Sequence, residues 1–260
     1  MSKGSVKVLS FWSRNYPKHN LDSRIVARPS ETAMSKDSVK LLNIWPSMFG
    51  LRVHYALDLK GVSYDYQEES LSNKSKELLE ANPIYTKIPV LIHNGKPICE
   101  SLVIVDYIDS VWPGSHKLLP EDPYEKAVAR FWADFGDKKL YDAGNQLIQA
   151  MGEEHKKAGE DFKWALMKID EALGTIAPGK PFFGGDAMNF ADVGLAPFIC
   201  RFKGYQKVGG FVLPGPEEWP NLYKWVDAIN SVDAIKKSTP SPDEVAEFAE
   251  VLRKRVLGAA

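Results

Sequence analysis

The chain has 260 residues, which is enough for one large domain or for two modest ones that each bury a core. Its 44% apolar and 26% charged residues are typical of a globular protein, and its net charge of −1 lacks the basic excess expected of a nucleic-acid binder. The longest apolar stretches, such as Leu102–Val105, are too short to cross a bilayer. The two cysteines, Cys99 and Cys200, form neither a disulfide framework nor a metal-binding spacing, which suits a reducing compartment.

An imperfect repeat stands at the beginning of the chain. Met1–Trp12 reads MSKGSVKVLSFW and Met34–Trp45 reads MSKDSVKLLNIW. Only the second copy leads into a segment with regular apolar spacing. Residues 1–33 contain six basic residues, two acidic residues and six serines, a composition also seen in organelle transit peptides. The sequence leaves two interpretations of this leader: a transit peptide, or a duplicated or mis-started segment with no fold of its own. It predicts that the first domain begins at residue 34.

Alternating strand and helix signals follow in residues 34–113. The pattern predicts strands at Val39–Ile44, Tyr64–Gln67, Val90–His93 and Lys96–Cys99, and helices at Phe49–Leu59, Ser75–Ala81 and Ser101–Trp112. Asn94-Gly95 is the strongest short hairpin signal, and Lys60-Gly61 and Asn82-Pro83 are typical ends of helices. The order βαβ–α–ββα predicts a small mixed sheet covered by helices, that is, an α/β domain.

After a linker at residues 114–123, which contains two prolines, residues 124–260 show helical spacing. Val128, Phe131, Trp132 and Phe135 form one apolar stripe. Further helices are predicted at Phe162–Leu173, Phe190–Cys200, Leu222–Ile229 and Asp243–Val256. The last of them has acidic residues at its start and basic residues at its end, as the helix dipole favours. The second part of the chain is therefore predicted to be all-helical.

Asn189 and Asp192 have the spacing of a reciprocal helix cap. Asn189 precedes an apolar run, and a carboxylate three residues later can reach back to its backbone. Asp192 stands at a loop–helix junction, as some catalytic acids do. We interpret it as structural.

Several catalytic signatures are missing from the sequence. It contains no phosphate-binding glycine loop, no GxSxG elbow and no HExxH motif. The five histidines are scattered and form no set of metal ligands. We therefore predict neither a metal site nor a dinucleotide cofactor.

Two segments at the ends of predicted strands combine polar groups with exposed backbone. Ser47 joins the first strand to the first helix, where it can serve simply as the N-cap. The same position places a hydroxyl where backbone N–H groups and the helix dipole favour an anion. Ile88-Pro89 begins the hairpin, where the proline either makes an ordinary turn or leaves the backbone of Ile88 open to a ligand.

The remaining candidates are charged or lie at a helix start. Glu100 precedes Ser101, and Ser101 is predicted to cap the helix that follows. Lys74 and Lys87 would be solvated charges in most proteins. Each of these signals is weak when taken alone.

In order and spacing, however, these residues are similar to a family pattern. Residues 39–113 resemble the glutathione domain of the tau-class plant glutathione transferases through the segments VKLLNIWPS, RVHYALDLKGV, NKS, IYTKIPVLIHNGKPICES and YIDSVWPG. ARFWADF at 129–135, FFGGD at 182–186 and EEWPNLYKW at 217–225 extend the resemblance to about residue 240, whereas residues 1–33 lie outside it. The resemblance implies a thioredoxin-like first domain and a helical second domain that contributes an electrophile pocket.

The resemblance also implies a role for each candidate residue. Ser47 would donate a hydrogen bond to the glutathione sulfur and favour the thiolate. The rest of glutathione would be bound by Lys74, Lys87, Ile88, Pro89, Glu100 and Ser101. The backbone of Ile88, next to an expected cis Pro89, would pair with the cysteinyl part. Glu100 would accept the γ-glutamyl ammonium, Ser101 would bind the α-carboxylate, and the two lysines would neutralise the glycyl carboxylate.

The electrophile pocket implied by the resemblance comprises Phe49, Tyr141, Asn145 and Ile148. Asn145 and Ile148 stand where tau-class members often have Arg and Trp, whereas Tyr141 is retained. Gly136 replaces a larger apolar residue within a helix, and His54 stands where a second Arg is common. These departures leave the glutathione residues intact and put the range of electrophiles in doubt.

The function implied is conjugation of the glutathione thiolate to hydrophobic electrophiles in detoxification and stress response, with reduction of organic hydroperoxides as a further activity. Glutathione is then a co-substrate, and no cofactor is needed. The resemblance also implies a cytoplasmic homodimer that binds neither nucleic acid nor membrane. A thiol transferase on this fold needs a cysteine at position 47, which is a serine here. The alternative is a carrier of hydrophobic small molecules with little turnover.

Overall fold

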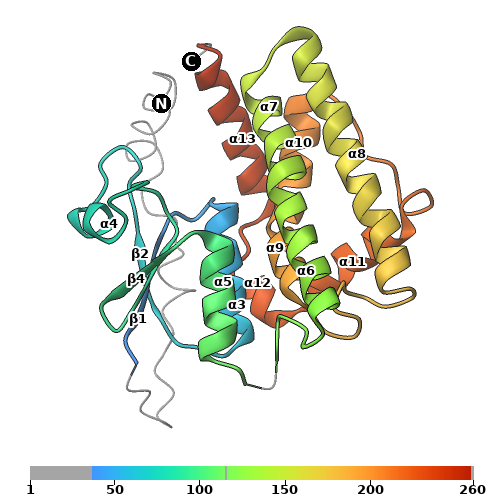
Figure 1. The fold of residues 1–260 in the computed structure, drawn as a ribbon. Coiled ribbons are helices and arrows are strands. Elements are labelled where there is room, and N and C mark those ends of the chain that lie inside the picture. Colours follow the sequence, from blue (N-terminus) through green and yellow to red (C-terminus); the bar gives the residue numbers. More distant parts are fainter. Residues whose placement is uncertain (1–36, 115, 259–260) are drawn as a thin grey trace. The chain divides into compact units, whose positions relative to one another are not determined.

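The computed structural model describes residues 37–114 and 116–258, which divide into two compact units at His116 and Lys117 (Figure 1). The leader at residues 1–33, and the first copy of the repeat with it, lies outside the described residues. None of the helices in the described ranges is long and apolar enough to cross a membrane.

The first unit is a mixed sheet with helices. Its elements are β1 (Val39–Asn43), α3 (Met48–Leu59), β2 (Asp65–Glu68), α4 (Lys76–Ala81), β3 (Val90–His93), β4 (Lys96–Cys99) and α5 (Ser101–Val111). The strand order is β2-β1-β3-β4, with β1 parallel to β2 and antiparallel to β3, and β3 antiparallel to β4. The predicted thioredoxin-like order βαβ–α–ββα is confirmed.

The central strand β1 and its neighbours form the core of this unit. Figure 1 shows α3 and α5 together on one face of the sheet and α4 on the other. Leu42, Leu78 and Val90 are fully buried and pack together between the sheet and α4. The hairpin turn between β3 and β4 is Asn94-Gly95, with φ of 51° and 76°, the left-handed conformation that two-residue hairpin loops require.

The second unit is helical, as predicted. Its elements are α6 (Pro123–Phe135), η2 (Gly136–Tyr141), α7 (Asp142–Gln149), α8 (Gly152–Ile176), α9 (Phe190–Leu195), η3 (Ala196–Arg201), α10 (Phe202–Gly209), α11 (Pro220–Ser231), α12 (Asp233–Ser238) and α13 (Pro242–Val256). Within this unit α6 packs on α9, α7 and α11 on α8, and α10 on α13.

Several stretches of the second unit differ from the sequence-based expectation. The short helices α7, α10 and α12 were not predicted, and α8 is longer than the predicted Phe162–Leu173. The predicted helix Phe190–Cys200 ends at Leu195 and continues as a 3-10 helix, because Pro197 has no N–H to donate to the preceding turn. The α-helix α6 ends at Phe135, and Gly136 is its C-cap residue. Gly136 also begins a π-helical stretch, Gly136–Tyr141, that joins α6 to α7.

Asp192 has the structural role expected from its spacing. The Asn189 side chain accepts from the N–H groups of Ala191 and Asp192, and Asp192 accepts from the Asn189 N–H at 2.8 Å, which completes a capping box. The fully buried carboxylate also accepts from the Phe183 N–H at 2.9 Å and the Trp225 indole N–H at 2.7 Å. Burial outweighs these bonds and raises the pKa of Asp192 to about 6.

Candidate active site

The register of the sheet brings the predicted binding segments to one edge. Leu42 at the end of β1 pairs with Val90 at the start of β3, which pairs with Cys99 at the end of β4. β2 runs parallel to β1 and therefore ends at the same edge. The segments that enter or leave the sheet there contain Ser47, Lys74, Lys87, Ile88, Pro89, Glu100 and Ser101.

Ser47 is the N-cap of α3, as its position predicted. Its backbone is extended, with φ −78° and ψ 113°, and its Oγ accepts a hydrogen bond from the Gly50 N–H at 3.1 Å. The side chain is buried, with 8% exposure. Because the oxygen is the acceptor in this bond, the hydroxyl hydrogen stays available for a partner at the positive end of the helix.

The expectation that Ser101 caps α5 is wrong. The N-cap position belongs to Glu100, and Ser101 is the first helical residue. The buried Ser101 Oγ instead accepts from Arg52 Nη1 of α3 at 3.2 Å. Arg52 is fully buried, and its guanidinium lies 5.3 Å from the centroid of the Phe49 ring. Because the Arg52 guanidinium donates to the Ser101 oxygen, the positive charge favours donation of the Ser101 hydroxyl hydrogen to an anionic partner.

Glu100 has a backbone that only a few non-glycine residues adopt. Its φ is 69°, its side chain is exposed, and it makes no capping hydrogen bond. Non-glycine residues in this region cost of order 1–3 kcal/mol and concentrate at functional sites. The strained backbone holds an exposed carboxylate one residue before Ser101.

The turn before β3 is ordered by Asn82 and carries the Ile88–Pro89 peptide bond, which is cis as expected. Asn82 is buried. Its side-chain oxygen accepts from the Tyr85 N–H at 3.2 Å, and its amide donates to the Lys87 carbonyl at 3.0 Å. The local role of this turn is thus to fix the main chain that enters β3.

Lys74 and Lys87 differ in their surroundings. The Lys74 ammonium donates to the carbonyl of Thr86 at 2.6 Å and to its hydroxyl at 3.0 Å, so it connects the segment after β2 to the turn before β3. An ammonium has three donors, so one N–H of Lys74 is left for a ligand. Lys87 is exposed. Lys87 directly precedes Ile88, and Lys74 contacts Thr86, which is two residues before Ile88.

Comparison with known proteins identifies the family. Residues 37–110 match the family described as glutathione S-transferase, N-terminal domain, and residues 159–228 match glutathione S-transferase, C-terminal domain. The chain is 46% identical over 219 residues to glutathione S-transferase U19 of Arabidopsis thaliana, with 84% of this chain and 97% of the relative covered. It is 44% identical over 218 residues to glutathione S-transferase 3 of Glycine max, with 84% and 97% covered.

Solved structures agree with this result. The tau-class glutathione S-transferase of mango, Mangifera indica, is similar with a TM-score of 0.79 and 40% identity over 83% of this chain and 98% of that one. Rice GST1, solved in complex with glutathione, has the same TM-score and identity over 85% and 99%. The chain belongs to the tau class of the glutathione S-transferase family.

The predicted electrophile residues of this tau-class glutathione transferase come from both units. Phe49 is in α3 of the first unit. Tyr141 ends η2, and burial raises the pKa of its phenol, with the charge of Asp142 adding to the effect. The Asn145 side-chain oxygen accepts from Gln149 at 2.7 Å, and Ile148 is 6% exposed. Their assignment to an electrophile pocket stays a prediction.

Two residues that contact the predicted site residues were not singled out from the sequence. Arg52 could have been noticed as a charged residue among the apolar positions of α3, a pattern that indicates a specific buried partner. Thr86 has no such signal, because its contact with Lys74 follows only from the path of the turn.

Proposed function

We propose that this glutathione transferase is a serine-type enzyme in which Ser47 stabilises the thiolate of bound glutathione. The observation that supports the proposal most strongly is the position of the Ser47 hydroxyl at the N-cap of α3. Its hydrogen and the helix dipole both favour a negative charge at the same point.

The expected stabilisation of the thiolate is large enough to lower the thiol pKa into the range needed for catalysis. A free thiol has a pKa near 8.5, and lowering it by about two units takes roughly 3 kcal/mol of preferential stabilisation of the anion. A hydrogen bond to a charged acceptor contributes about 1.5–3 kcal/mol and a helix N-terminus about 0.3–1 kcal/mol. Together these contributions reach the required order of magnitude.

The rest of the proposed site matches the charges of glutathione. Glutathione carries two carboxylates and one ammonium. We assign the ammonium to the Glu100 carboxylate, the γ-glutamyl carboxylate to Ser101, to which Arg52 donates, and the glycyl carboxylate to Lys74 and Lys87. The main chain of Ile88, beside Pro89, pairs with the cysteinyl part.

The proposed reaction is nucleophilic substitution or addition by the thiolate. Glutathione loses its thiol proton to solvent, and the sulfur lone pair forms a bond to the electrophilic carbon. With an aryl halide the carbon–halogen bond breaks, and the halogen leaves as halide with the bonding electron pair. With an organic hydroperoxide the sulfur attacks the terminal oxygen, the O–O bond breaks, and the alkoxide takes a proton from solvent to leave as an alcohol. A second glutathione then converts the resulting sulfenic acid to the disulfide and water. The protein contributes a lowered thiol pKa and proximity.

The alternative, a carrier of hydrophobic molecules, is favoured by Asn145 and Ile148 at positions where tau-class members often have Arg and Trp. Initial rates with glutathione and an aryl halide, measured together with the equilibrium binding of a hydrophobic dye, separate the two functions. The enzyme predicts saturable turnover that requires glutathione. A carrier predicts tight dye binding with a rate no higher than that of glutathione alone.

We also propose that the protein is a cytoplasmic homodimer. Apolar side chains on the surface of the first unit support a partner, since Ile84 and Tyr85 before β3 and Val103 in α5 are 82%, 53% and 56% exposed. Sedimentation analysis at micromolar concentration tests this assignment, with twice the monomer mass as the expected result.

A further inference from the structure

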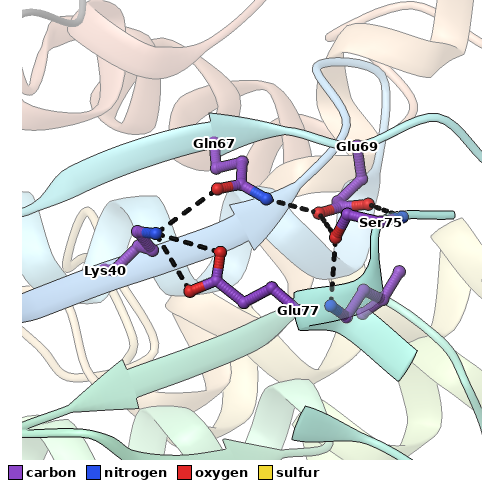
Figure 2. Close-up of polar contacts among 6 residues, drawn as sticks. Lys40, Gln67, Glu69, Ser75 and Glu77 are labelled. Carbon is purple, nitrogen blue, oxygen red and sulfur yellow. Dashed lines mark hydrogen bonds and ion pairs between the residues drawn. The ribbon is translucent and has the colours of Figure 1, made fainter. Parts of the chain in front are cut away.

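A buried carboxylate outside the residues assigned so far stands beside the proposed glycyl end of the site. Glu69 follows β2 and is 5% exposed. Its Oε1 accepts from the Ser75 hydroxyl at 2.6 Å and from the Gln67 amide at 2.8 Å, and its Oε2 accepts from the Ser75 N–H at 3.1 Å (Figure 2).

The three partners of Glu69 are all donors, so this position requires a carboxylate. An amide in its place would keep one acceptor oxygen and turn an NH2 group toward a donor of Ser75 or Gln67. A buried carboxylate is unfavourable unless its oxygens are satisfied. The geometry therefore indicates that Glu69 is retained for the contacts it makes.

This hydrogen-bond network connects the segment after β2 and the start of α4 to strands β1 and β2. Ser75 is the N-cap of α4, and its Oγ accepts from the Leu78 N–H at 3.0 Å while it donates to Glu69. Lys40 of β1 donates to Gln67 at 3.3 Å and to Glu77 of α4 at 2.9 Å. The start of α4 is thus held against β1 and β2 through Glu69 and Lys40 (Figure 2).

The residue that this network positions most directly is Lys74. The Ser75 N–H that Glu69 accepts belongs to the peptide group formed with Lys74, so the bond fixes the orientation of that peptide. The Lys74 side chain then reaches Thr86, whose φ of 51° is a strained value for a β-branched residue. Glu69 itself contacts Gln67 and Ser75, so any influence on a ligand acts through Lys74.

We propose that Glu69 is a positioning residue for recognition of the glycyl carboxylate of glutathione. It holds the Lys74–Ser75 peptide so that the Lys74 ammonium is placed for that carboxylate before glutathione binds. The inference rests on the proposed function, in which Lys74 binds the glycyl carboxylate.

The test compares glutathione with γ-glutamylcysteine, which lacks the glycyl residue. Dissociation constants for both ligands are measured by calorimetry for the wild type, Glu69→Gln, Lys74→Met and the double variant, with kcat at saturating glutathione. Glu80→Gln is the matched control, because Glu80 is an exposed glutamate of the adjacent helix α4 whose contact is with Lys76. Ser75→Ala, which removes one donor to Glu69, replaces Glu69→Gln if that variant does not fold.

Glu69→Gln is expected to weaken glutathione binding at least fivefold, with γ-glutamylcysteine binding and kcat within twofold of the wild type. In the Lys74→Met background it should change glutathione affinity by less than twofold, since the group it positions is gone. Equal losses for both ligands, or losses that add to those of Lys74→Met, overturn the inference. Wild-type affinity in Lys74→Met refutes the assignment of Lys74 in the proposed function, whereas a loss in Lys74→Met with none in Glu69→Gln refutes the role of Glu69 alone.

Discussion

The side-chain amide of Asn43 lies directly against the Cα of Gly50. A Cβ on Gly50 would stand 2.0 Å from both Nδ2 and Oδ1 of Asn43. Asn43 is the last residue of β1 and is fully buried, and neither atom of its amide has a hydrogen-bond partner among the described residues. Gly50 is also the residue whose N–H donates to Ser47. The contact therefore sets the distance between the end of β1 and the turn that contains the proposed catalytic serine.

Gly50→Ala should disturb both the fold and the site. The added methyl must displace Asn43 or the first turn of α3, and overpacking of this kind costs typically 1–3 kcal/mol. We expect a free energy of unfolding lower by about 2 kcal/mol in urea titrations and a lower kcat. Asn43→Ala combined with Gly50→Ala removes the clash and should restore most of the stability. A double variant no more stable than Gly50→Ala would show that the contact is not the cause.

Glu100 is expected to lower the stability of the fold through its positive φ and to raise the affinity for glutathione through its carboxylate. Glu100→Gln should raise the dissociation constant for glutathione at least tenfold, equivalent to about 1.4 kcal/mol. Glu100→Gly should lose as much affinity without loss of stability, because glycine adopts a φ near 69° without the steric cost of a Cβ. Calorimetry measures the affinity of each variant for glutathione, and thermal unfolding measures its stability. Unchanged glutathione binding in Glu100→Gln would contradict the assignment.

Asp192 should make stability depend on pH with a definite sign. Its folded pKa of about 6 lies above the usual 3.8, so the folded state holds the proton more tightly. The contribution of Asp192 to the free energy of unfolding is therefore largest below about pH 4. It falls as the pH rises through 6 and is constant above that, and the total decrease is at most about 3 kcal/mol. The wild type minus Asp192→Asn difference in unfolding free energy, measured by urea titration from pH 4.5 to 7.5, should decrease across this range. A difference that increases with pH would contradict the burial argument.

The features that could be predicted from the sequence depend on neighbours in the chain. The Ser47 cap, the Asn94-Gly95 hairpin and the Asn189–Asp192 capping box each need only a few consecutive residues. Regular apolar spacing was enough for the order of strands and helices in the first unit, whereas the short helices α7, α10 and α12 of the second unit were not predicted. These local signals agree with one another, and the fold class followed from them.

The features that could not be predicted depend on contacts between distant segments. Arg52 and Ser101 are 49 positions apart, and Ser101 was expected to cap a helix because serine often does so. The Glu69 contacts require knowledge of how the segment after β2 folds back on itself. The 3-10 stretch at Pro197 could have been found, since a proline inside an apolar helix pattern is a direct signal of a break.

The pKa of the thiol of bound glutathione tests most directly whether Ser47 stabilises the thiolate. The thiolate absorbance of the complex is titrated against pH for the wild type, Ser47→Ala and Ser241→Ala. Ser241 is a matched control, because it also caps a helix, α13, by accepting from the Glu244 N–H, and its loss should cost a similar fraction of stability.

We predict that Ser47→Ala alone raises the pKa of the bound thiol and lowers turnover ten- to a thousandfold, the range expected for a loss of about 1.4–4 kcal/mol of anion stabilisation. Affinity for glutathione should change little, because the charged groups supply most of the binding. Ser241→Ala should titrate like the wild type. A Ser47→Ala protein with the wild-type thiolate titration and turnover would contradict the account.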